Sequence, residues 1–375
     1  MRIGIDAREL CGRATGVGRY LGGLLHAWAA DGRASAHDFV LYAPEAIALP
    51  LDARRFATRI VAGGAGTWWE QVSLPRAAAA DHVDVWFAPA YTAPLRIGVP
   101  VVAAIHDVSF AAHPEWFRVR EGARRRWLVR RTAHKAAAVI TISEFSRREI
   151  VERLGVDDGR IHVVPPGVGA GGSGLGPSRL TSTASPKPPA PRPCRALYVG
   201  SIFNRRHVVD LIRAFAPIAR ARPDASLDIV GDNRTYPRID VAATIAREEL
   251  GDRVRWHEYL GDAELDGLYA QARAFAFLSE YEGLGLTPLE ALAAGVPPVV
   301  LDTPVAREAC GEAALYVPAI DLRAITRALE SALFDDGARA RILAAAPATL
   351  AKYSWPRAGR DTLAVIERAP RNARR

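Results

Sequence analysis

Two glutamates, Glu282 and Glu290, stand eight positions apart, separated by a glycine-containing loop and the predicted start of a helix. The segment before them, residues 273–279, is short, apolar and aromatic, which predicts a buried parallel strand. Pro288 and Gly295 are typical of a helix that opens at the proline and ends at the glycine. Carboxylates accept hydrogen bonds from hydroxyl groups, so this spacing predicts a site that binds the hydroxyls of one ligand at both ends.

The loop between the two acids brings backbone amides toward the same ligand. Glycine lets the backbone approach a ligand closely, and the free amides of a helix N-terminus attract phosphate without a metal ion. We therefore expect a phosphate group of a ligand to lie against this loop, whose residues are Gly283, Leu284, Gly285 and Leu286. The alternative is that Glu290 caps or pairs within its own helix while Glu282 is a solvated loop acid.

The stretch from Glu282 to Val300 resembles the E-x7-E signature of the retaining glycosyltransferases of family four, which have the GT-B fold. That resemblance implies an α/β protein with two Rossmann-like domains, each a doubly wound parallel sheet, facing an interdomain cleft. It also implies that Glu290 holds the ribose of a nucleotide diphosphate sugar and that Glu282 holds the sugar hydroxyls. Relatives in this family include bacterial surface-polysaccharide transferases and mannosyltransferases.

The length and the pattern of apolar runs predict two domains. A chain of 375 residues exceeds one ordinary core, and 49% hydrophobic residues suffice for two cores. Strand-like runs alternate with helical patterns, which predicts parallel sheets covered by helices. The runs lie at residues 2–6, 39–42, 83–87, 101–105, 138–142, 162–164, 196–200, 226–231, 253–256 and 273–279.

The domain boundaries follow from a change in composition. Residues 169–194 are rich in Gly, Ser, Thr, Ala and Pro, which is typical of a flexible linker. We expect an N-terminal acceptor-side domain at 1–168 and a C-terminal donor-binding domain at 195–375. The last helix, at about 354–368, resembles the GT-B helix that packs back on the N-terminal domain.

A second loop, from Gly200 to His207, follows the first strand of the C-terminal domain and belongs at the same sheet edge as Glu282. Gly200 allows close backbone approach, and Arg205 and Arg206 carry charge that neutralises a diphosphate. The family's usual wording here ends in Arg-Lys-Asn, so Arg206 replaces a lysine and His207 an asparagine. The alternative is a pair of solvated arginines.

Candidate residues in the N-terminal half lie at strand ends. The turn that carries Gly16 and Gly18 resembles the family's Gly-Ile-Gly-Arg-Tyr opening, which implies a contact with the donor; a ligand-free turn is the alternative. His106 follows a predicted strand directly and stands beside Asp107. The tract resembles the family's strand-end His-Asp segment, which implies that His106 faces the reacting sugar. Ser143 is expected to cap the helix at 144–154.

Composition excludes several classes of protein. The three cysteines, Cys11, Cys194 and Cys310, lack metal-ligand spacing, which predicts a reduced protein with no disulfide, structural zinc or other cofactor. The N-terminus is charged at once and no run of 18 apolar residues occurs, so we expect a cytoplasmic protein. A net charge of +8 suits phosphate-bearing ligands or an anionic lipid surface.

The segment from Glu115 to Lys135 is strongly basic and includes Arg124, Arg125 and Arg126. A solvated helix face is one interpretation, and peripheral contact with the inner face of the plasma membrane, where a lipid-linked acceptor lies, is the other. In the second case the run from Arg118 to Lys135 lies on one face beside the cleft, with Trp116, Phe117 and Trp127 near the lipid. Nucleic-acid binding is disfavoured because the run lacks an aromatic recognition motif.

These observations predict a retaining, metal-independent hexosyltransferase, with mannose one candidate sugar. It would transfer the sugar from a nucleotide diphosphate sugar to a hydroxyl of a glycan or lipid-linked acceptor in surface polysaccharide synthesis. Its catalytic residues would be His106 and Glu282. The alternative is a non-catalytic protein of the same fold that binds a nucleotide sugar or a glycan.

Overall fold

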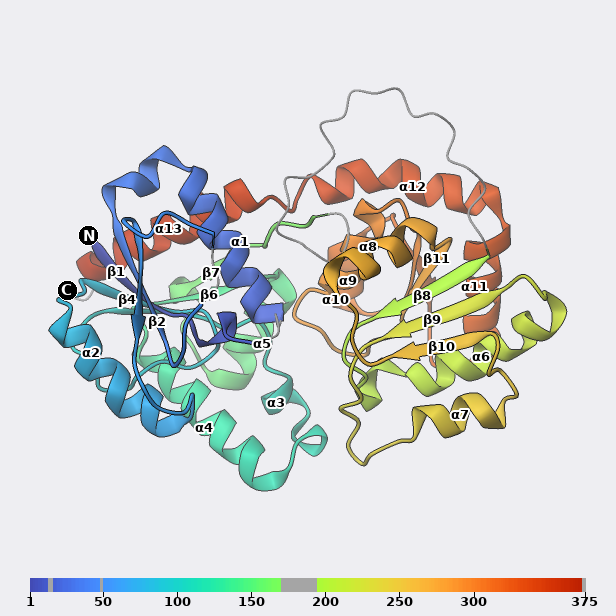
Figure 1. The fold of residues 1–375 in the computed structure, drawn as a ribbon, viewed down its shortest axis with the longest axis horizontal. Helices are drawn as coiled ribbons and strands as arrows, with labels where there is room; N and C mark the ends of the chain where they lie inside the picture. The colour runs from blue at the N-terminus through green and yellow to red at the C-terminus, as the bar shows by residue number, and fades with distance from the viewer. Residues whose placement is uncertain (13–15, 48–49, 170–193, 373–375) are drawn as a thin grey trace. The chain divides into compact units, whose positions relative to one another are not determined.

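The computed structural model describes residues 1–12, 16–47, 50–169 and 194–372 (Figure 1). Among these, the residues within Met1–Gly167 and Tyr353–Arg375 form one compact unit, and those within Val168–Lys352 form a second. Each unit is built on its own parallel sheet. Residues 170–193 of the predicted linker lie outside the described residues.

The first unit contains a seven-stranded sheet in the order β3-β2-β1-β4-β5-β6-β7, and all neighbouring strands are parallel. The strands are β1 (Arg2–Asp6), β2 (Asp38–Ala43), β3 (Phe56–Ile60), β4 (Val85–Ala88), β5 (Val101–Ala104), β6 (Ala138–Thr141) and β7 (Ile161–Val163). Strand β3 was not predicted from the sequence. It lies at the sheet edge and buries only Phe56, so it lacks the apolar run that marks the other strands.

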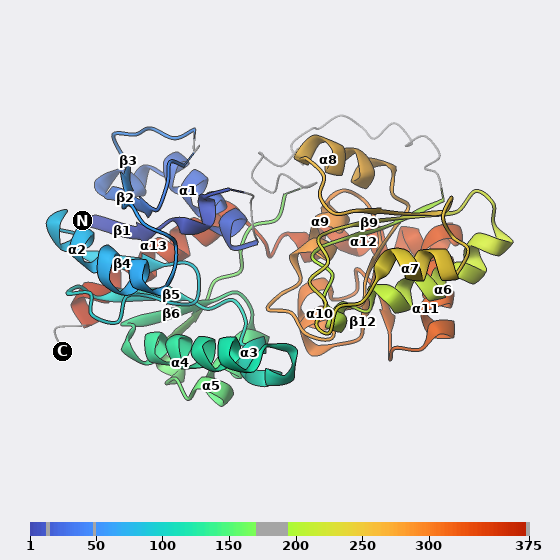
Figure 2. The ribbon, with the colours of Figure 1, turned by 60° about the horizontal axis from the view of Figure 1, so that its bottom comes forward.

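Helices cover both faces of this sheet. Figure 2 shows α4 and α5 on one side of the strands and α1 on the other. The helices are α1 (Gly16–Ala30), α2 (Leu74–Ala80), α3 (Ser109–Ala112), α4 (Val119–Lys135), α5 (Glu144–Leu154) and α13 (Trp355–Asn372). Short helical turns are η1 (Arg8–Leu10), η2 (Gly32–Ala36), η3 (Trp69–Ser73), η4 (Pro114–Trp116) and η5 (Asp158–Arg160). Ser143 caps α5 by accepting a hydrogen bond from the Ser146 amide at 3.0 Å, which confirms the predicted cap.

The last helix, α13, packs against α1 and the middle of the same sheet. The Trp28 indole on α1 donates a 2.8 Å hydrogen bond to the carbonyl of Gly359. A Cβ atom added at Gly23 would lie 2.5 Å from the Trp355 ring, and one at Gly167 would lie 2.3 Å from it. Glycine at these two positions therefore makes room for the Trp355 ring.

The second unit contains a six-stranded parallel sheet in the order β10-β9-β8-β11-β12-β13. The strands are β8 (Arg195–Val199), β9 (Ser226–Val230), β10 (Val254–His257), β11 (Ala274–Phe277), β12 (Pro298–Leu301) and β13 (Leu315–Val317). Strands β12 and β13, like β3, were not predicted from the sequence. The helices are α6 (Val208–Ala221), α7 (Val241–Arg247), α8 (Asp262–Gln271), α9 (Leu286–Ala293), α10 (Pro304–Cys310), α11 (Leu322–Phe334) and α12 (Asp336–Leu350), with a 3-10 turn η7 (Asn204–Arg206). Figures 1 and 2 show α8 and α9 on one side of the sheet and α6 and α7 on the other.

Both sheets reverse their strand order at one point, between β1 and β4 in the first and between β8 and β11 in the second. Ligands of doubly wound sheets bind beyond the carboxyl ends of the strands at such a point. In the second unit, the loops at that position are residues 200–207 after β8 and residues 278–285 after β11. Among the described residues, no helix combines the length and the apolar character needed to cross a bilayer.

Candidate active site

The two loops beyond β8 and β11 hold most of the residues that the sequence predicts for the donor site. Glu280 donates its amide to the carbonyl of Arg205 at 3.0 Å, so the loops are joined through their backbones. The Arg205 guanidinium lies 4.3 Å from the Phe203 ring centroid and donates to the Tyr281 carbonyl at 3.4 Å. The predicted neighbourhood of the two loops is therefore present in the structure.

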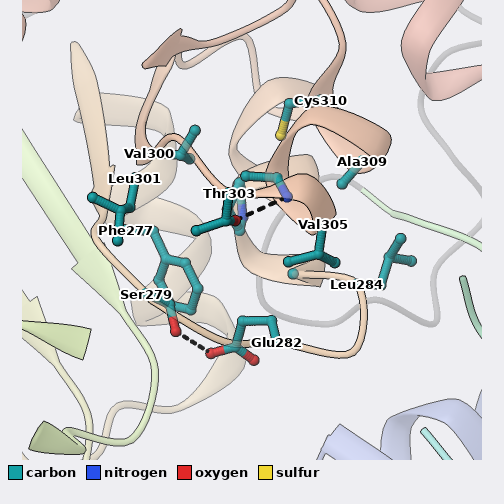
Figure 3. Close-up of a pocket in the computed structure, with 13 residues that line it drawn as sticks. Phe277, Ser279, Glu282, Leu284, Val300, Leu301, Thr303, Val305, Ala309 and Cys310 are labelled. Carbon is teal, nitrogen blue, oxygen red and sulfur yellow. Dashed lines mark hydrogen bonds between the residues drawn. The ribbon is translucent and has the colours of Figure 1, made fainter. Parts of the chain in front are cut away.

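Arg206 and Glu282 form an ion pair across the two loops. The Arg206 Nε donates to Glu282 Oε1 at 2.8 Å, and its Nη1 donates to the Ser201 carbonyl at 3.0 Å. Ser279 donates its hydroxyl to the same carboxylate oxygen at 2.8 Å (Figure 3). Only 13% of the Arg206 side chain and 17% of the Glu282 side chain are exposed. Glu282 is thus a positioned, paired carboxylate and not a solvated loop acid.

The environment of Arg206 strengthens its charged form. Burial by itself would lower the pKa of Arg206, but the Glu282 carboxylate outweighs that effect and the pKa is raised. The guanidinium also lies 5.4 Å from the Phe203 ring centroid and 4.9 Å from that of Phe277. An arginine held between two aromatic rings loses little further side-chain entropy when it binds an anion.

Glycines shape both loops. Gly200 has φ 145°, and a Cβ atom there would lie 2.9 Å from Arg206 Nη1. Gly285 has φ 84° and precedes α9 directly. Helix α9 begins at Leu286, two residues before Pro288, so the prediction that the proline opens the helix is wrong in this detail. The left-handed Gly285 sets the helix start, and Pro288 still lies in the first turn, where it has no intrahelical hydrogen bond to lose.

Glu290 lies in α9 and only 7% of it is exposed. A helix that buries a carboxylate next to a glycine loop is unusual, because burial disfavours charge unless the environment compensates it. The ribose contact expected of Glu290 stays a prediction, as do the amide contacts expected of the loop residues.

A largely apolar pocket lies beside the Glu282 loop (Figure 3). It is lined by residues of β11, β12, α9, α10 and the loop after β11, including Phe277, Leu284 and Cys310. Glu282 brings a charged group to this lining. Burial raises the pKa of Cys310 to about 12, so this thiol stays neutral at physiological pH. The pocket therefore offers an apolar wall beside a single anchored carboxylate.

His106 follows β5 in the first unit and is buried between Tyr20 and Tyr91, at ring-centroid distances of 4.6 and 5.6 Å. Its Nε2 donates to the Pro89 carbonyl at 2.8 Å, so its Nδ1 is the acceptor in the neutral ring. Burial lowers the pKa of His106 and keeps the ring neutral at pH 7. Hydrogen bonds from Ser109 and Tyr91 outweigh burial at Asp107 and lower its pKa.

The expected glycine turn before α1 differs from the structure. Gly16 and Gly18 both lie in the first turn of α1, which begins at Gly16. First-turn amides have no intrahelical acceptor, so glycine is tolerated there without a special turn. The predicted donor contact of these two residues stays a prediction.

The basic segment forms α4, but its arginines do not share one face. Arg125 lies over the rings of Tyr91, Phe110 and Phe117 at 5.0, 5.3 and 5.9 Å, and Arg126 donates to the Phe110 carbonyl. The prediction that the whole run lies on one face is therefore wrong for Arg125 and Arg126, because Arg125 packs against aromatic rings and Arg126 bonds a backbone carbonyl.

Trp127 is 53% exposed on α4, and Arg131 lies 5.6 Å from its ring. Trp116 instead stacks on His113 with ring centroids 3.9 Å apart. The exposed arginines of this helix, which we call the α4 stripe, are Arg120, Arg124, Arg130 and Arg131.

Sequence reasoning missed three residues that support the site. Ser279 fixes the Glu282 carboxylate, and Phe203 and Phe277 enclose Arg206. The position of Ser279 directly before the loop was the available signal, since a strand-end hydroxyl is well placed to bond a following loop. Within the described residues, no group of three or more His, Cys, Asp or Glu side chains is arranged to hold a metal ion.

Two family models match the chain. The model described as Glycosyltransferase Family 4 matches residues 14–170, and the model described as Glycosyl transferases group 1 matches residues 184–349. One curated relative is the O-antigen chain mannosyltransferase B of Escherichia coli, 27% identical over 303 residues that cover 76% of this chain and 74% of the relative. Another is the MMP α-(1→4)-mannosyltransferase of Mycolicibacterium hassiacum, 28% identical over 298 residues that cover 73% and 66%.

Solved structures agree on the fold. Anabaena HepE in complex with UDP and glucose superposes with a TM-score of 0.73 at 18% identity, covering 98% of this chain and 99% of HepE. WaaG, a glycosyltransferase of lipopolysaccharide biosynthesis, superposes with a TM-score of 0.68 at 18% identity, covering 100% and 98%. Two family models that span most of the sequence, glycosyltransferase relatives and two parallel-sheet units together show that the chain belongs to the group 1 and family 4 glycosyltransferases, and is an enzyme with the GT-B fold.

Proposed function

We propose that the protein is a retaining hexosyltransferase that takes its sugar from a nucleotide diphosphate sugar and needs no metal ion. The observation that carries this proposal is the pair of joined loops at the β8–β11 switch point, where Arg206 and Glu282 are held in a partly buried ion pair. A fixed guanidinium beside the glycine loop of α9 supplies the positive charge that a departing diphosphate requires.

In the proposed reaction, the bond between the anomeric carbon and the diphosphate oxygen breaks and a bond to the acceptor hydroxyl oxygen forms. The hydroxyl proton passes to the leaving phosphate. Arg205, Arg206 and the amides of residues 283–286 stabilise the negative charge that grows on the phosphate. Gly200 has no side chain, so the phosphate can approach the backbone there. Glu290 accepts hydrogen bonds from the ribose.

Glu282 accepts hydrogen bonds from the sugar hydroxyls, and Ser279 keeps its carboxylate in place. His106, neutral and fixed by Pro89, offers a polar group without charge to the reacting sugar. Gly16 and Gly18 contribute backbone contacts to the donor in the proposed complex. No carboxylate is assigned as a nucleophile.

Mannose is the sugar we favour, because two of the relatives are mannosyltransferases. The HepE structure contains UDP and glucose, so UDP-glucose is the second donor to be compared with GDP-mannose. The acceptor we propose is a hydroxyl of a glycan or a lipid-linked glycan in surface polysaccharide synthesis.

The experiment that tests the activity measures release of nucleoside diphosphate from GDP-mannose and from UDP-glucose, with and without a glycan acceptor. Turnover that depends on an acceptor supports the transferase, and NMR of the product's anomeric configuration tests retention. An inverted product would refute retention, and activity abolished by EDTA and restored by Mg²⁺ would refute metal independence. Binding without turnover on any acceptor would favour a binding protein of the same fold.

We also propose that the enzyme works in the cytoplasm and contacts an anionic membrane through the α4 stripe. The stripe is exposed, and Trp127 lies within it, half exposed. A basic helix face with an exposed tryptophan suits a surface of anionic headgroups, where a lipid-linked acceptor lies.

A further inference from the structure

His207 lies where the loop after β8 enters α6, and its backbone is held in an uncommon conformation. Its φ of 49° and ψ of 37° place it in the left-handed region. Residues other than glycine are uncommon in that region, although histidine is tolerated there better than most, so contacts of the side chain help to hold it. The His207 side chain makes such contacts, because both of its ring nitrogens face carboxylates.

The His207 ring joins two elements. Its Nδ1 lies 3.0 Å from an Asp210 carboxylate oxygen in the first turn of α6, and its Nε2 lies 3.0 Å from Glu280 Oε1 in the loop after β11. With the ring protonated, the Glu280 contact is an ion pair. Only the protonated imidazole carries N–H groups on both nitrogens, so this arrangement suits the charged ring.

The charges around the ring favour protonation. Burial would lower the pKa of His207, but the carboxylates of Asp210 and Glu280, which accept hydrogen bonds from the ring and attract its positive charge, outweigh burial, and the pKa is raised above its ordinary value. Opposing positive charge comes from neighbouring arginines. Arg213 lies 3.7 Å from Asp210, and Arg206 is engaged with Glu282 on the other side of the loop.

Glu280 connects His207 to the donor-binding loop. Its amide bonds to the Arg205 carbonyl, and Glu282 follows it by two residues. We propose that protonated His207 is a positioning residue that holds the loop after β11 against the loop after β8, keeping Arg206 and Glu282 in the geometry that binds the donor diphosphate. The effect on donor affinity rests on the proposed function, whereas the contact between the two loops does not.

The sign of the pH dependence follows from this arrangement. A histidine whose folded pKa is raised contributes its contacts fully below about pH 6.5, its ordinary unfolded value, and loses them as pH rises through the folded pKa. Donor affinity should therefore fall as pH rises above about 6.5. Two partly exposed ion pairs set the size of the fall, which we expect to be on the order of twofold to tenfold.

The test compares the full-length wild type with His207→Asn, since asparagine tolerates the left-handed conformation but carries no charge. Histidine side-chain NMR gives the pKa of His207. Calorimetry at pH 6.5 and pH 8.5 gives the affinity for GDP-mannose and UDP-glucose, whose diphosphates do not titrate in this range. His37→Asn is the matched control. His37 also pairs with a carboxylate, its Nε2 lying 2.8 Å from Glu367 Oε1, but both of these residues belong to the first unit.

The expected result is a His207 pKa above 6.5, with donor affinity that falls with pH in the wild type and in His37→Asn. In His207→Asn the affinity should be low at both pH values and should not change between them. A His207 pKa at or below 6.5 would overturn the proposal. So would pH dependence in His207→Asn that equals that of the wild type. If neither sugar nucleotide binds any variant, the proposed function fails, while a Glu280→Gln variant that leaves the His207 pKa unchanged would refute the contact between the loops.

Discussion

Replacing Arg206 with alanine would leave the Glu282 carboxylate without its cationic partner in a largely buried site. Removing one partner of a fully buried pair costs about 3–5 kcal/mol. Here 13% and 17% of the two side chains are exposed, and Ser279 still donates to the carboxylate. We therefore expect the free energy of unfolding of the second unit to fall by about 2–4 kcal/mol, a range lowered for partial exposure.

A double-mutant cycle separates the pair from other effects of the arginine. Glu282→Ala alone leaves a buried guanidinium, whereas the combination with Arg206→Ala removes both charges and should recover part of the loss. Hydrogen exchange on peptides of β8 and β11 reports the second unit without averaging over the whole chain. Arg206→Lys keeps the charge but loses the second hydrogen bond, so it should lie between the wild type and alanine.

Two results would refute this reasoning. A loss below about 1 kcal/mol for Arg206→Ala would place the pair with ordinary surface ion pairs. Strict additivity of the two single variants would show that the charges do not interact. The proposed phosphate contact has its own test, since Arg206→Ala should weaken donor binding and make the residual binding less sensitive to salt. An unchanged salt response would argue against the phosphate contact while leaving the ion pair intact.

Three further predictions concern other parts of the molecule. Glu290→Ala should weaken donor binding by about 1–3 kcal/mol, because the ribose hydroxyls lose their acceptor; unchanged affinity in calorimetry would contradict that role. Gly23→Ala should lower stability by about 1–3 kcal/mol in thermal unfolding, since its Cβ would lie 2.5 Å from the Trp355 ring; Gly267→Ala in α8, with nothing within 4 Å, is the matched control and should not destabilise. Reversal of the α4 stripe to glutamate should abolish binding to anionic vesicles, at about 1 kcal/mol for each residue, and spare donor binding. The matched control reverses four exposed arginines of the second unit, which are Arg247, Arg323, Arg327 and Arg341. Equal vesicle binding by this control and by the variant with the reversed α4 stripe would refute the membrane contact.

Most of the two sheets could be predicted because their central strands are buried on both faces. Parallel strands covered by helices appear as short continuous apolar runs, as residues 101–105 and 274–277 do. The exposed edge strand β3 carries no such run, so periodicity gives no signal for it. The predicted start of α9 at Pro288 was two residues too late. The left-handed backbone of Gly285 sets the start at Leu286, and the pattern of apolar residues does not report that conformation.

The site was predicted as a set of residues but not as a set of contacts. The spacing of Glu282 and Glu290 identifies the acids, and the shared sheet edge brings the arginine loop near them. The pairing of Arg206 with Glu282 joins positions 76 residues apart, and local sequence carries no record of such a pairing. The α4 arginines illustrate the same limit, since the inward turn of Arg125 depends on aromatic rings supplied by other segments.

Arg206 and His207, the two residues that differ from the family's usual Arg-Lys-Asn motif, share a physical explanation in the contacts between the two loops. A lysine at Arg206 would present one point charge, whereas the guanidinium bonds Glu282 and the Ser201 carbonyl together. An asparagine at His207 would suit the left-handed backbone but would bring no charge to Asp210 and Glu280. Both replacements therefore add charge contacts at this junction, each with one partner in the loop after β11, and the second makes the joining of the loops depend on pH.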